Sequence, residues 1–407
     1  MINFAKLFKS RSDYPAREAF GWQEYFSLIS CATYYRLSKI DPPYGGKYQK
    51  NFEFKFTQSF QSDSSRLVST GTSAVYVSLK SLPIPQNSVV LVSSVTDGGC
   101  ISAIIEAGFK PALVDTGHQT FNINLESVIK TYDEIKSRNI NPPSCLVACH
   151  IGGEPIIDIE EISKWCTSKG IFLIEDCSQA IKAQVAGRSV GTFGQLAAFS
   201  LMYRKNISSA GSAGIILIND ASYLNDVLAM SDRGKPIWRT DKNLNDPGLN
   251  LYPALNHNNN EFIASIANSS LRRIEKTNLK RVNFCLELLG QLKHYKIPIE
   301  NNRFNSNWAP FYLTLFKNDG VAINIKMLAE QMNIKHKVPL LVTYGCLASK
   351  WPWLRKYLVF PQEMPLATKN IDNSFNLFLN EKYTSHHAEK IAQAASISLK
   401  NIQSNVV

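Results

Sequence analysis

Residues 144–180 read SCLVACHIGGEPIIDIEEISKWCTSKGIFLIEDCSQA. The apolar runs at 144–150 and 171–176 are continuous rather than alternating, which is typical of strands buried on both faces of a sheet. Residues 159–169 lie between these runs, show a helical pattern and end at Gly170. A strand, a helix and a second strand in this order predict a unit of a parallel sheet.

The same alternation extends to both sides of this unit. Helices are expected at 73–82 and 98–108, each between apolar runs. The chain from about residue 46 to 260 is therefore predicted to form one large α/β domain, with a mixed, mostly parallel sheet flanked by helices. The further strands are predicted at 89–94, 111–115, 197–201 and 213–218.

The pattern changes after residue 260. Apolar residues recur at helical intervals over 261–290, which predicts one long connecting helix. Residues 291–407 combine a strand-like run with a final helical stretch and predict a smaller C-terminal α+β domain. Residues 1–45 are expected to pack on either domain, and the Asn-rich stretch 243–262 is expected to form a loop.

The composition limits the class of protein. The 407 residues are 44% hydrophobic, which excludes a wholly disordered chain. No window approaches the ~18 apolar residues of a membrane span. The N-terminal segment lacks an apolar core and carries Asp13 and Glu18, so we expect no signal peptide. The formal net charge of +11 fits a nucleic-acid surface, a membrane surface or an anionic small-molecule substrate.

Eight cysteines are scattered along the chain, mostly between apolar residues. We interpret them as buried, reduced thiols of a cytoplasmic protein. Cys145 and Cys149 are four residues apart in a predicted strand and lack a second pair, so no metal site is expected.

Polar features lie at the helix starts and strand ends where α/β sheets bind their ligands. Gly71, Thr72 and Ser73 open a predicted helix, and free amides with two hydroxyls suit a phosphate there. An ordinary helix N-cap is the alternative. The polar stretch LNHNNNEF (255–262) precedes the predicted long helix, and loop solvation alone also explains it.

Two further features follow predicted strands. Asp176 and Gln179 come after the strand 171–176, and a carboxylate buried there needs a partner. A capped helix start is the alternative. Lys205 follows the strand 197–201 and is adjacent to Arg204. A desolvated lysine beside another cation can lose its proton and act as a nucleophile, whereas a surface lysine is the alternative.

The order of these features is more specific than any one of them. A phosphate site comes first, an acid follows about 100 residues later, and a lysine follows about 30 residues after the acid. This is the order expected for a pyridoxal-phosphate enzyme of the aspartate-aminotransferase fold (fold type I). In such enzymes an acid pairs with the pyridinium nitrogen and a lysine forms the Schiff base.

Seven colinear segments resemble the DegT/DnrJ/StrS family of sugar aminotransferases. The stretch AGFKPALVDTGHQTFNIN (107–124) is similar to the family's GAKPVFVDVDPDTYNID, and IEDCSQA (174–180) is similar to its IEDAAQA. FSLMYRKNI (199–207) resembles the family's lysine segment. The other four segments are GGKYQKNFEFKF (45–56), GTSAVYVSLKSL (71–82), HIGGEPIIDIEEI (150–162) and ALNHNNNEFIASIANSSLRRI (254–274).

The resemblance implies a role for each matching residue around the cofactor ring. Lys205 would be the Schiff-base lysine and the proton shuttle of a ping-pong transamination. Asp176 would be the partner of the pyridinium nitrogen, and Gln179 would lie near the ring oxygen.

The resemblance also implies how the phosphate of pyridoxal 5'-phosphate is held. Thr72, Ser73 and Ser200 match the family's phosphate-binding positions. In the family an asparagine reaches the phosphate from the neighbouring subunit, and Asn256 is its counterpart. A homodimer with shared active sites is therefore implied.

The chain departs from the family pattern at four places. Thr96-Asp97 replaces a pair whose aromatic residue stacks on the cofactor ring, and Asp97 could instead contact the ring substituents or a substrate hydroxyl. Residues 210–213 lack the family's glutamate. Gly152 replaces a tyrosine, and Asn258 replaces an arginine.

These features predict a pyridoxal-phosphate-dependent aminotransferase that transfers an amino group from L-glutamate to a keto-sugar. The product would be an amino sugar for a surface glycan such as lipopolysaccharide, or for a secondary metabolite. Lys205 argues against the family's dehydratases, in which histidine replaces the lysine. A family member with altered catalysis and a binding or regulatory role is the alternative, whereas no motif supports nucleic-acid binding.

Part of the positive charge can be assigned to the predicted small domain. Six basic residues between 321 and 360 accompany one acid, Glu330. A basic face there could attract an anionic sugar, and a solvated surface is the alternative. The six basic residues are Lys326, Lys335, Lys337, Lys350, Arg355 and Lys356.

Two arginines outside this segment, Arg233 and Arg239, are candidates for binding the donor carboxylate.

Overall fold

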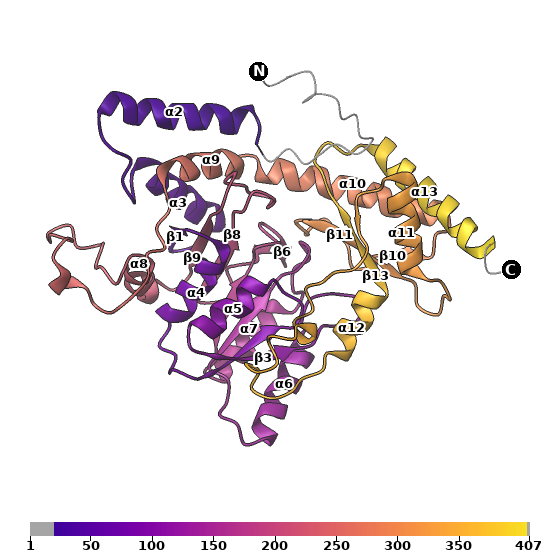
Figure 1. The fold of residues 1–407 in the computed structure, drawn as a ribbon, viewed down its shortest axis with the longest axis horizontal. Helices are drawn as coiled ribbons and strands as arrows, with labels where there is room; N and C mark the ends of the chain where they lie inside the picture. The colour runs from indigo at the N-terminus through magenta and orange to yellow at the C-terminus, as the bar shows by residue number, and fades with distance from the viewer. Residues whose placement is uncertain (1–19, 405–407) are drawn as a thin grey trace.

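A computed structural model of the chain describes residues 20–404 (Figure 1). The expected lack of a signal peptide, and much of the predicted segment 1–45, concern residues outside this range. A seven-stranded sheet of order β1-β9-β8-β5-β4-β2-β3 forms the centre of the large domain. Its strands are β1 (Ser64–Val68), β2 (Val89–Ser93), β3 (Lys110–Val114), β4 (Cys145–Cys149), β5 (Phe172–Asp176), β8 (Leu196–Ser200) and β9 (Gly214–Ile218).

The predicted fold class is confirmed. All six strands expected from continuous apolar runs are present, and every residue of β2, β4 and β9 is buried. Strand β1 was not predicted. Strand β9 pairs antiparallel with both β1 and β8, so it alone runs against the other six, and the sheet is mixed but mostly parallel.

Helices cover both faces of the sheet because successive side chains of a strand point to opposite faces. Val90 and Val92 share one apolar cluster with α4 (Gly71–Ser81) and α5 (Gly98–Glu106). Val89 and Leu91 share another with α6 (Leu125–Ser137) and α7 (Ile159–Ser168). The other helices before residue 260 are α2 (Trp22–Ser38), α3 (Lys47–Phe60), α8 (Leu224–Ser231) and the 3₁₀ helices Ala221–Tyr223 and Pro247–Leu249. A short hairpin is formed by β6 (Gln184–Val185) and β7 (Arg188–Ser189).

The single helix predicted over 261–290 is divided in the structure. Helix α9 (Glu261–Leu271) ends at Arg272, and α10 (Ile274–His294) begins after Arg273. The two helices follow one another along one side of the molecule (Figure 1). Tertiary contacts hold the junction, because the Ser270 hydroxyl accepts the amide of Ser208 and Arg273 forms an ion pair with Glu24. Helical periodicity alone does not reveal such contacts.

The smaller domain contains an antiparallel sheet of order β10-β11-β13-β12. The loop that contains Gln362 also covers the free edge of the large sheet at β3. The Gln362 side chain accepts a hydrogen bond from the amide of Leu113 and donates one to the carbonyl of the same residue. The elements are β10 (Ile299–Glu300), β11 (Tyr312–Lys317), α11 (Ile325–His336), β12 (Leu340–Leu341), the 3₁₀ helix Ala348–Lys350, α12 (Pro365–Asp372), β13 (Ser374–Phe378) and α13 (Ser385–Ser404).

All eight cysteines lie within the described residues and are free thiols; seven are buried, and Cys346 is partly exposed. Over residues 20–404 we find no helix that is both long and apolar enough to span a membrane.

One buried carboxylate connects three segments at the end of the central strands. Glu175 in β5 is fully buried and accepts the amides of Gly191, Phe193 and Gly194 at 2.6–2.9 Å. His150, directly after β4, lies with Nε2 3.1 Å from the same carboxylate. The His150 Nδ1 accepts a hydrogen bond from the Ile156 amide, so this nitrogen carries no proton. The ring proton is therefore on Nε2, which donates a hydrogen bond to Glu175.

We expect Glu175→Gln to lower the free energy of unfolding by about 3 kcal/mol. The NH₂ group of glutamine would replace one carboxylate oxygen, so a donor would lie against backbone N–H donors that now have an acceptor. Chemical denaturation followed by circular dichroism measures the change. Glu160→Gln, at a partly exposed position in α7 where the carboxylate pairs with Lys164, is the matched control and should lower stability much less than Glu175→Gln does. Equal stability of the two variants would contradict the role assigned to Glu175.

Candidate functional site

A cavity of about 280 Å³ lies at the carboxyl ends of the parallel strands. This is the edge at which open α/β sheets bind ligands. The cavity brings together six of the eight predicted site residues: Thr72, Asp97, Asp176, Gln179, Ser200 and Lys205. Its other lining residues are Thr70, Gly71, Val75, Thr96, Cys100, Cys149, His150, Ile151, Ser178, Met202 and Ser212.

The start of α4 forms one wall of the cavity. Thr70 caps the helix by accepting the Ser73 amide at 2.8 Å. The first amides of a helix have no acceptor within it, so those of Gly71 and Thr72 remain available to an anion at this wall. A Cβ on Gly71 would lie 2.7 Å from the Cβ of Ser200, so only glycine lets the helix start approach β8 this closely.

Hydroxyl groups surround the same helix start. Thr72, Ser200 and Ser212 line the cavity, and Ser212 was not among the predicted residues. Ser73 lies outside the lining, and its hydroxyl is bonded to the hydroxyls of Ser69 and Thr70. The predicted contact of Ser73 with a phosphate therefore stays a prediction.

Asp176 ends β5 at the floor of the cavity and is buried. Burial raises the pKa of this carboxyl, although hydrogen bonds from Ser178 and the charge of Lys205 oppose the shift. The Ser178 amide donates to Oδ1 at 3.0 Å. The carboxylate is thus suited to a cationic partner inside the cavity.

Lys205 is also buried and lies in the loop that follows β8. Its Nζ is 4.7 Å from the centre of the Phe311 ring, which comes from the smaller domain. The side chain of the next residue, Asn206, forms hydrogen bonds in two directions. Its Oδ1 accepts from Arg281 at 2.6 Å, and its Nδ2 donates to Asn278 at 3.0 Å. Arg281 is itself buried and pairs with Glu381. This network fixes the backbone that carries Lys205.

Residues of the smaller domain pack against the segment that follows the cavity residue Ile151, in a contact that no sequence pattern indicated. Gly152 and Gly153 have φ angles of +71° and +92°, and their carbonyls accept the amides of Phe311 and Ala309. A Cβ on Gly152 would lie 2.8 Å from the Tyr312 ring. Tyr312 therefore occupies space beside the position where the family has a tyrosine. The replacement at Gly152 was visible in the sequence, but its packing partner was not.

Gln179 connects both domains. Its Oε1 accepts the Gly152 amide at 2.9 Å, and its Nε2 donates to the Tyr344 hydroxyl at 3.3 Å. Burial of Tyr344 raises the pKa of its hydroxyl far above the usual value, so the group stays neutral.

The remaining candidates lie at the edge of the cavity or outside it. Asp97 is exposed at the rim and caps α5 by accepting the Gly99 amide at 2.8 Å. Asn256 is exposed and lies outside the lining, so its contact with a partner subunit stays a prediction. Arg233 pairs with Asp232, and Arg239 pairs with Asp241, and neither lines the cavity.

The six basic residues between 321 and 360 do not form one face. Lys326 donates to the backbone carbonyls of Val342, Ile371 and Ser374, which is a structural role. Lys350 and Arg355 instead line a second cavity of about 960 Å³ in the smaller domain.

The chain resembles known proteins in both sequence and structure. The sequence pattern that defines the DegT/DnrJ/EryC1/StrS aminotransferase family matches residues 41–396 of the chain. The GDP-perosamine synthase of Vibrio cholerae is 28% identical over 57% of this chain and 59% of its own length. The matched region thus spans less than two thirds of that relative.

Solved structures share the fold over nearly the whole chain. The aminotransferase from Psychrobacter cryohalolentis superposes with a TM-score of 0.83 at 22% identity, covering 96% of this chain and 100% of that one. The Escherichia coli GDP-4-keto-6-deoxy-D-mannose-3-dehydratase, solved with bound hydrated PLP, gives 0.79 at 19% identity and covers 92% and 97% of the two chains.

We expect Gly71→Ala to destabilise the protein by about 1–3 kcal/mol, because its Cβ would force α4 away from Ser200. Gly290→Ala is the matched control. Gly290 lies inside α10 with open space around it, so alanine there should stabilise by about 0.5–1 kcal/mol. Thermal or chemical unfolding measures both changes. The interpretation fails if both substitutions are stabilising.

Proposed function

Because the chain belongs to the DegT/DnrJ/EryC1/StrS aminotransferase family, we propose that it is a pyridoxal-phosphate-dependent enzyme that transfers an amino group to a keto-sugar. One observation carries the proposal. The start of α4, the carboxylate of Asp176 and the amine of Lys205 meet in a single cavity. This is the set of groups that the cofactor requires for its phosphate, its ring nitrogen and its aldehyde.

The residues present fit the cofactor. The amides of Gly71 and Thr72, with the hydroxyls of Thr72 and Ser200, would hold the phosphate. Asp176 would pair with the protonated ring nitrogen. The raised pKa of this carboxyl supports the assignment, since a buried carboxylate is stabilised by a cation placed against it.

Bound pyridoxal phosphate supplies an electron sink that stabilises negative charge on the carbon next to the transferred amine. The Lys205 amine would hold the cofactor through its aldehyde carbon and, once released, take the proton from Cα of the amino donor. The same amine can then return a proton on the same face of the site. Asn206 and Arg281 would position this base by fixing the adjoining backbone.

The donor and the acceptor are proposed at the level of chemical class. We propose L-glutamate as donor, in a ping-pong cycle, and an anionic keto-sugar as acceptor, for an amino sugar of a surface glycan or a secondary metabolite. Relatives named for nucleotide-linked sugars support the acceptor class. Lys350 and Arg355 offer positive charge for an anionic group. A cytoplasmic location fits eight free thiols.

We also propose a homodimer with shared active sites. Helix α2 leaves large apolar side chains exposed, among them Trp22 at 75% and Phe26 at 62%. Exposed apolar surfaces of this kind are typical of interfaces. Asn256, exposed outside the cavity, is then available to the site of the partner subunit.

Borohydride reduction followed by peptide mass spectrometry tests the function. We expect reduction to fix the cofactor onto the peptide that contains Lys205, and Lys205→Arg to lose both this mass and the visible absorbance of the bound cofactor. Lys182→Arg is the matched control, because burial lowers the pKa of Lys182 although it lies outside the cavity. Label on another lysine would overturn the assignment.

The same holoenzyme separates the proposed activity from a binding or regulatory role. Glutamate should convert the bound cofactor to its pyridoxamine form, with a matching spectral change. If no amino donor among the common amino acids does so, the family member with altered catalysis becomes the correct interpretation.

We expect Asp176→Asn to weaken cofactor binding by about tenfold to a hundredfold, because the ring nitrogen loses its charged partner. The cofactor-free variant should nevertheless be more stable than wild type at pH 7. A folded-state pKa raised above 3.8 means that ionisation of Asp176 costs stability at neutral pH. This difference should shrink as the pH falls through that raised pKa and the wild-type carboxyl takes up its proton.

Cofactor titration and denaturation of the cofactor-free protein measure the two effects. Asp241→Asn is the control, since Arg239 lowers the pKa of that exposed carboxyl and no gain in stability is expected. A destabilised Asp176→Asn apoprotein would contradict the electrostatic argument.

A further inference from the structure

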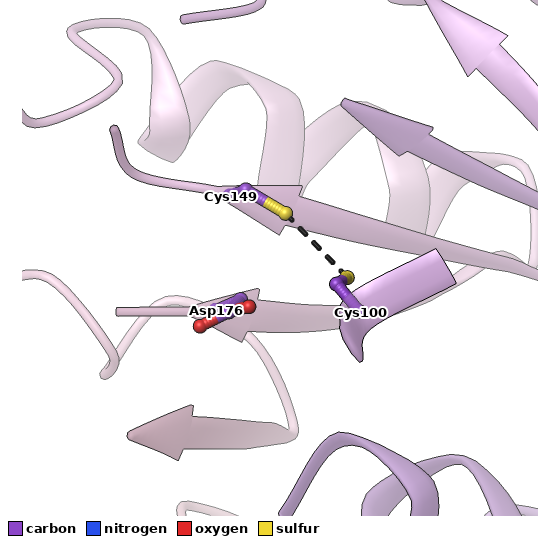
Figure 2. Close-up of side chains that lie close together, drawn as sticks. All are labelled: Cys100, Cys149 and Asp176. Atoms are coloured by element: carbon purple, nitrogen blue, oxygen red, sulfur yellow. Dashed lines mark hydrogen bonds between the residues drawn. The ribbon is translucent and has the colours of Figure 1, made fainter. Parts of the chain in front are cut away.

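Two thiols meet at the floor of the cavity beside Asp176. Cys100 lies in the first turn of α5, and Cys149 ends β4. Their sulfur atoms are 3.7 Å apart, and Figure 2 shows both side chains pointing toward each other next to the carboxylate at the end of β5. One ligand atom from each of the three residues lies within 4.8 Å of the other two. All three are buried and line the cavity.

The spacing of the sulfur atoms matches a particular ion. Two thiolates bound to a tetrahedral zinc at about 2.3 Å are about 3.8 Å apart. The separation of 3.7 Å needs almost no rearrangement to reach this value. Thiolates with a carboxylate are ligands that zinc accepts, whereas calcium and magnesium select oxygen alone.

One neighbouring hydroxyl would support a thiolate at Cys149, whereas the neighbouring Cys149, burial and Asp176 raise the pKa of the Cys100 thiol, so only a bound cation would keep that sulfur ionised. The Thr96 hydroxyl donates to the Cys149 sulfur at 3.3 Å, an outer contact that would orient this ligand. Asp176 Oδ1 accepts the Ser178 amide, so a carboxylate oxygen can turn to the metal without loss of that contact.

We propose that the floor of this cavity binds one zinc ion through Cys100, Cys149 and Asp176 when the organic cofactor is absent. The two thiols release their protons to solvent on binding, and no oxidation or reduction takes place. The fourth position faces the cavity and holds water, which is the arrangement of an open rather than a closed zinc site.

Zinc and the organic cofactor then exclude one another, a consequence that rests on the proposed function. Asp176 cannot serve both as a zinc ligand and as the partner of the ring nitrogen. Zinc ions would therefore delay loading of the cofactor into the apoprotein.

Other thiol groupings do not offer the same geometry. Cys145 lies four residues from Cys149 along β4, about 13 Å away at the rise of a strand. The neighbouring cluster of His150, Glu175 and Cys177 is already engaged, since both ring nitrogens of His150 and both oxygens of Glu175 are hydrogen-bonded.

Cobalt(II) serves as the optical probe for the zinc site. The cofactor-free protein should bind one cobalt ion per chain, with thiolate-to-cobalt charge-transfer absorption that zinc removes. Cys100→Ser and Cys149→Ser should each lose at least half of this absorption and weaken zinc binding more than tenfold. Cys145→Ser, an equally buried cysteine of β4, should retain both. Full absorption in Cys100→Ser, or loss of the absorption in Cys145→Ser, overturns the proposal.

A second measurement uses the wild-type chain and does not depend on the folding of any variant. X-ray absorption of the protein loaded with one zinc equivalent should show two sulfur neighbours at about 2.3 Å, with oxygen completing the shell. A shell of oxygen and nitrogen only would overturn the proposal.

Cofactor loading in the presence of zinc separates this inference from the proposed function. Zinc should slow the appearance of bound-cofactor absorbance in wild type but not in Cys100→Ser. If the cofactor never binds while cobalt still gives the thiolate absorption, the proposed function fails and the metal site stands. Unimpeded loading with a full zinc equivalent bound would refute the competition.

Discussion

The buried carboxylate of Glu175 determines the shape of the sheet edge on which the cavity depends. A charge taken fully out of water is tolerated only when donors surround it, and here three amides and the ring of His150 do so. These contacts tie together the end of β4, the end of β5 and the turn that leads into β8. Asp176, the next residue, therefore projects into the cavity from a strand end that cannot shift independently of its neighbours.

The two domains meet at this edge rather than at a separate interface. The carbonyls of Gly152 and Gly153, directly after His150, bind the segment that delivers Phe311 to Lys205. From the other side, Arg281 of α10 holds Asn206, and Glu381 of the smaller domain holds Arg281. The position of Lys205 thus depends on both domains, although the lysine itself lies in the larger one. At the same edge, the two proposals share one residue: Asp176 would pair with the ring nitrogen of the cofactor, or would bind zinc together with Cys100 and Cys149 when the cofactor is absent.

Much of the fold could be predicted because its strands are buried on both faces and its helices are amphipathic. The six apolar runs became strands, and the residues at their carboxyl ends, Asp176 and Lys205 among them, met as parallel topology requires. The break between α9 and α10 was missed, since it depends on contacts of Ser270 and Arg273 with distant residues. Phe311, Tyr344 and the pairing of Cys100 with Cys149 were missed for the same reason.

The sequence by itself determined which segments are buried strands and which polar residues stand at strand ends, because these follow from local periodicity and residue chemistry. Only the tertiary structure decided which of those residues share a cavity. It left Ser73 bonded to its neighbours and Asn256 on the surface, and it placed two cysteines 49 positions apart in contact. Proximity between residues far apart in the chain is set by the packing of helices onto both faces of the sheet, and no local pattern records it.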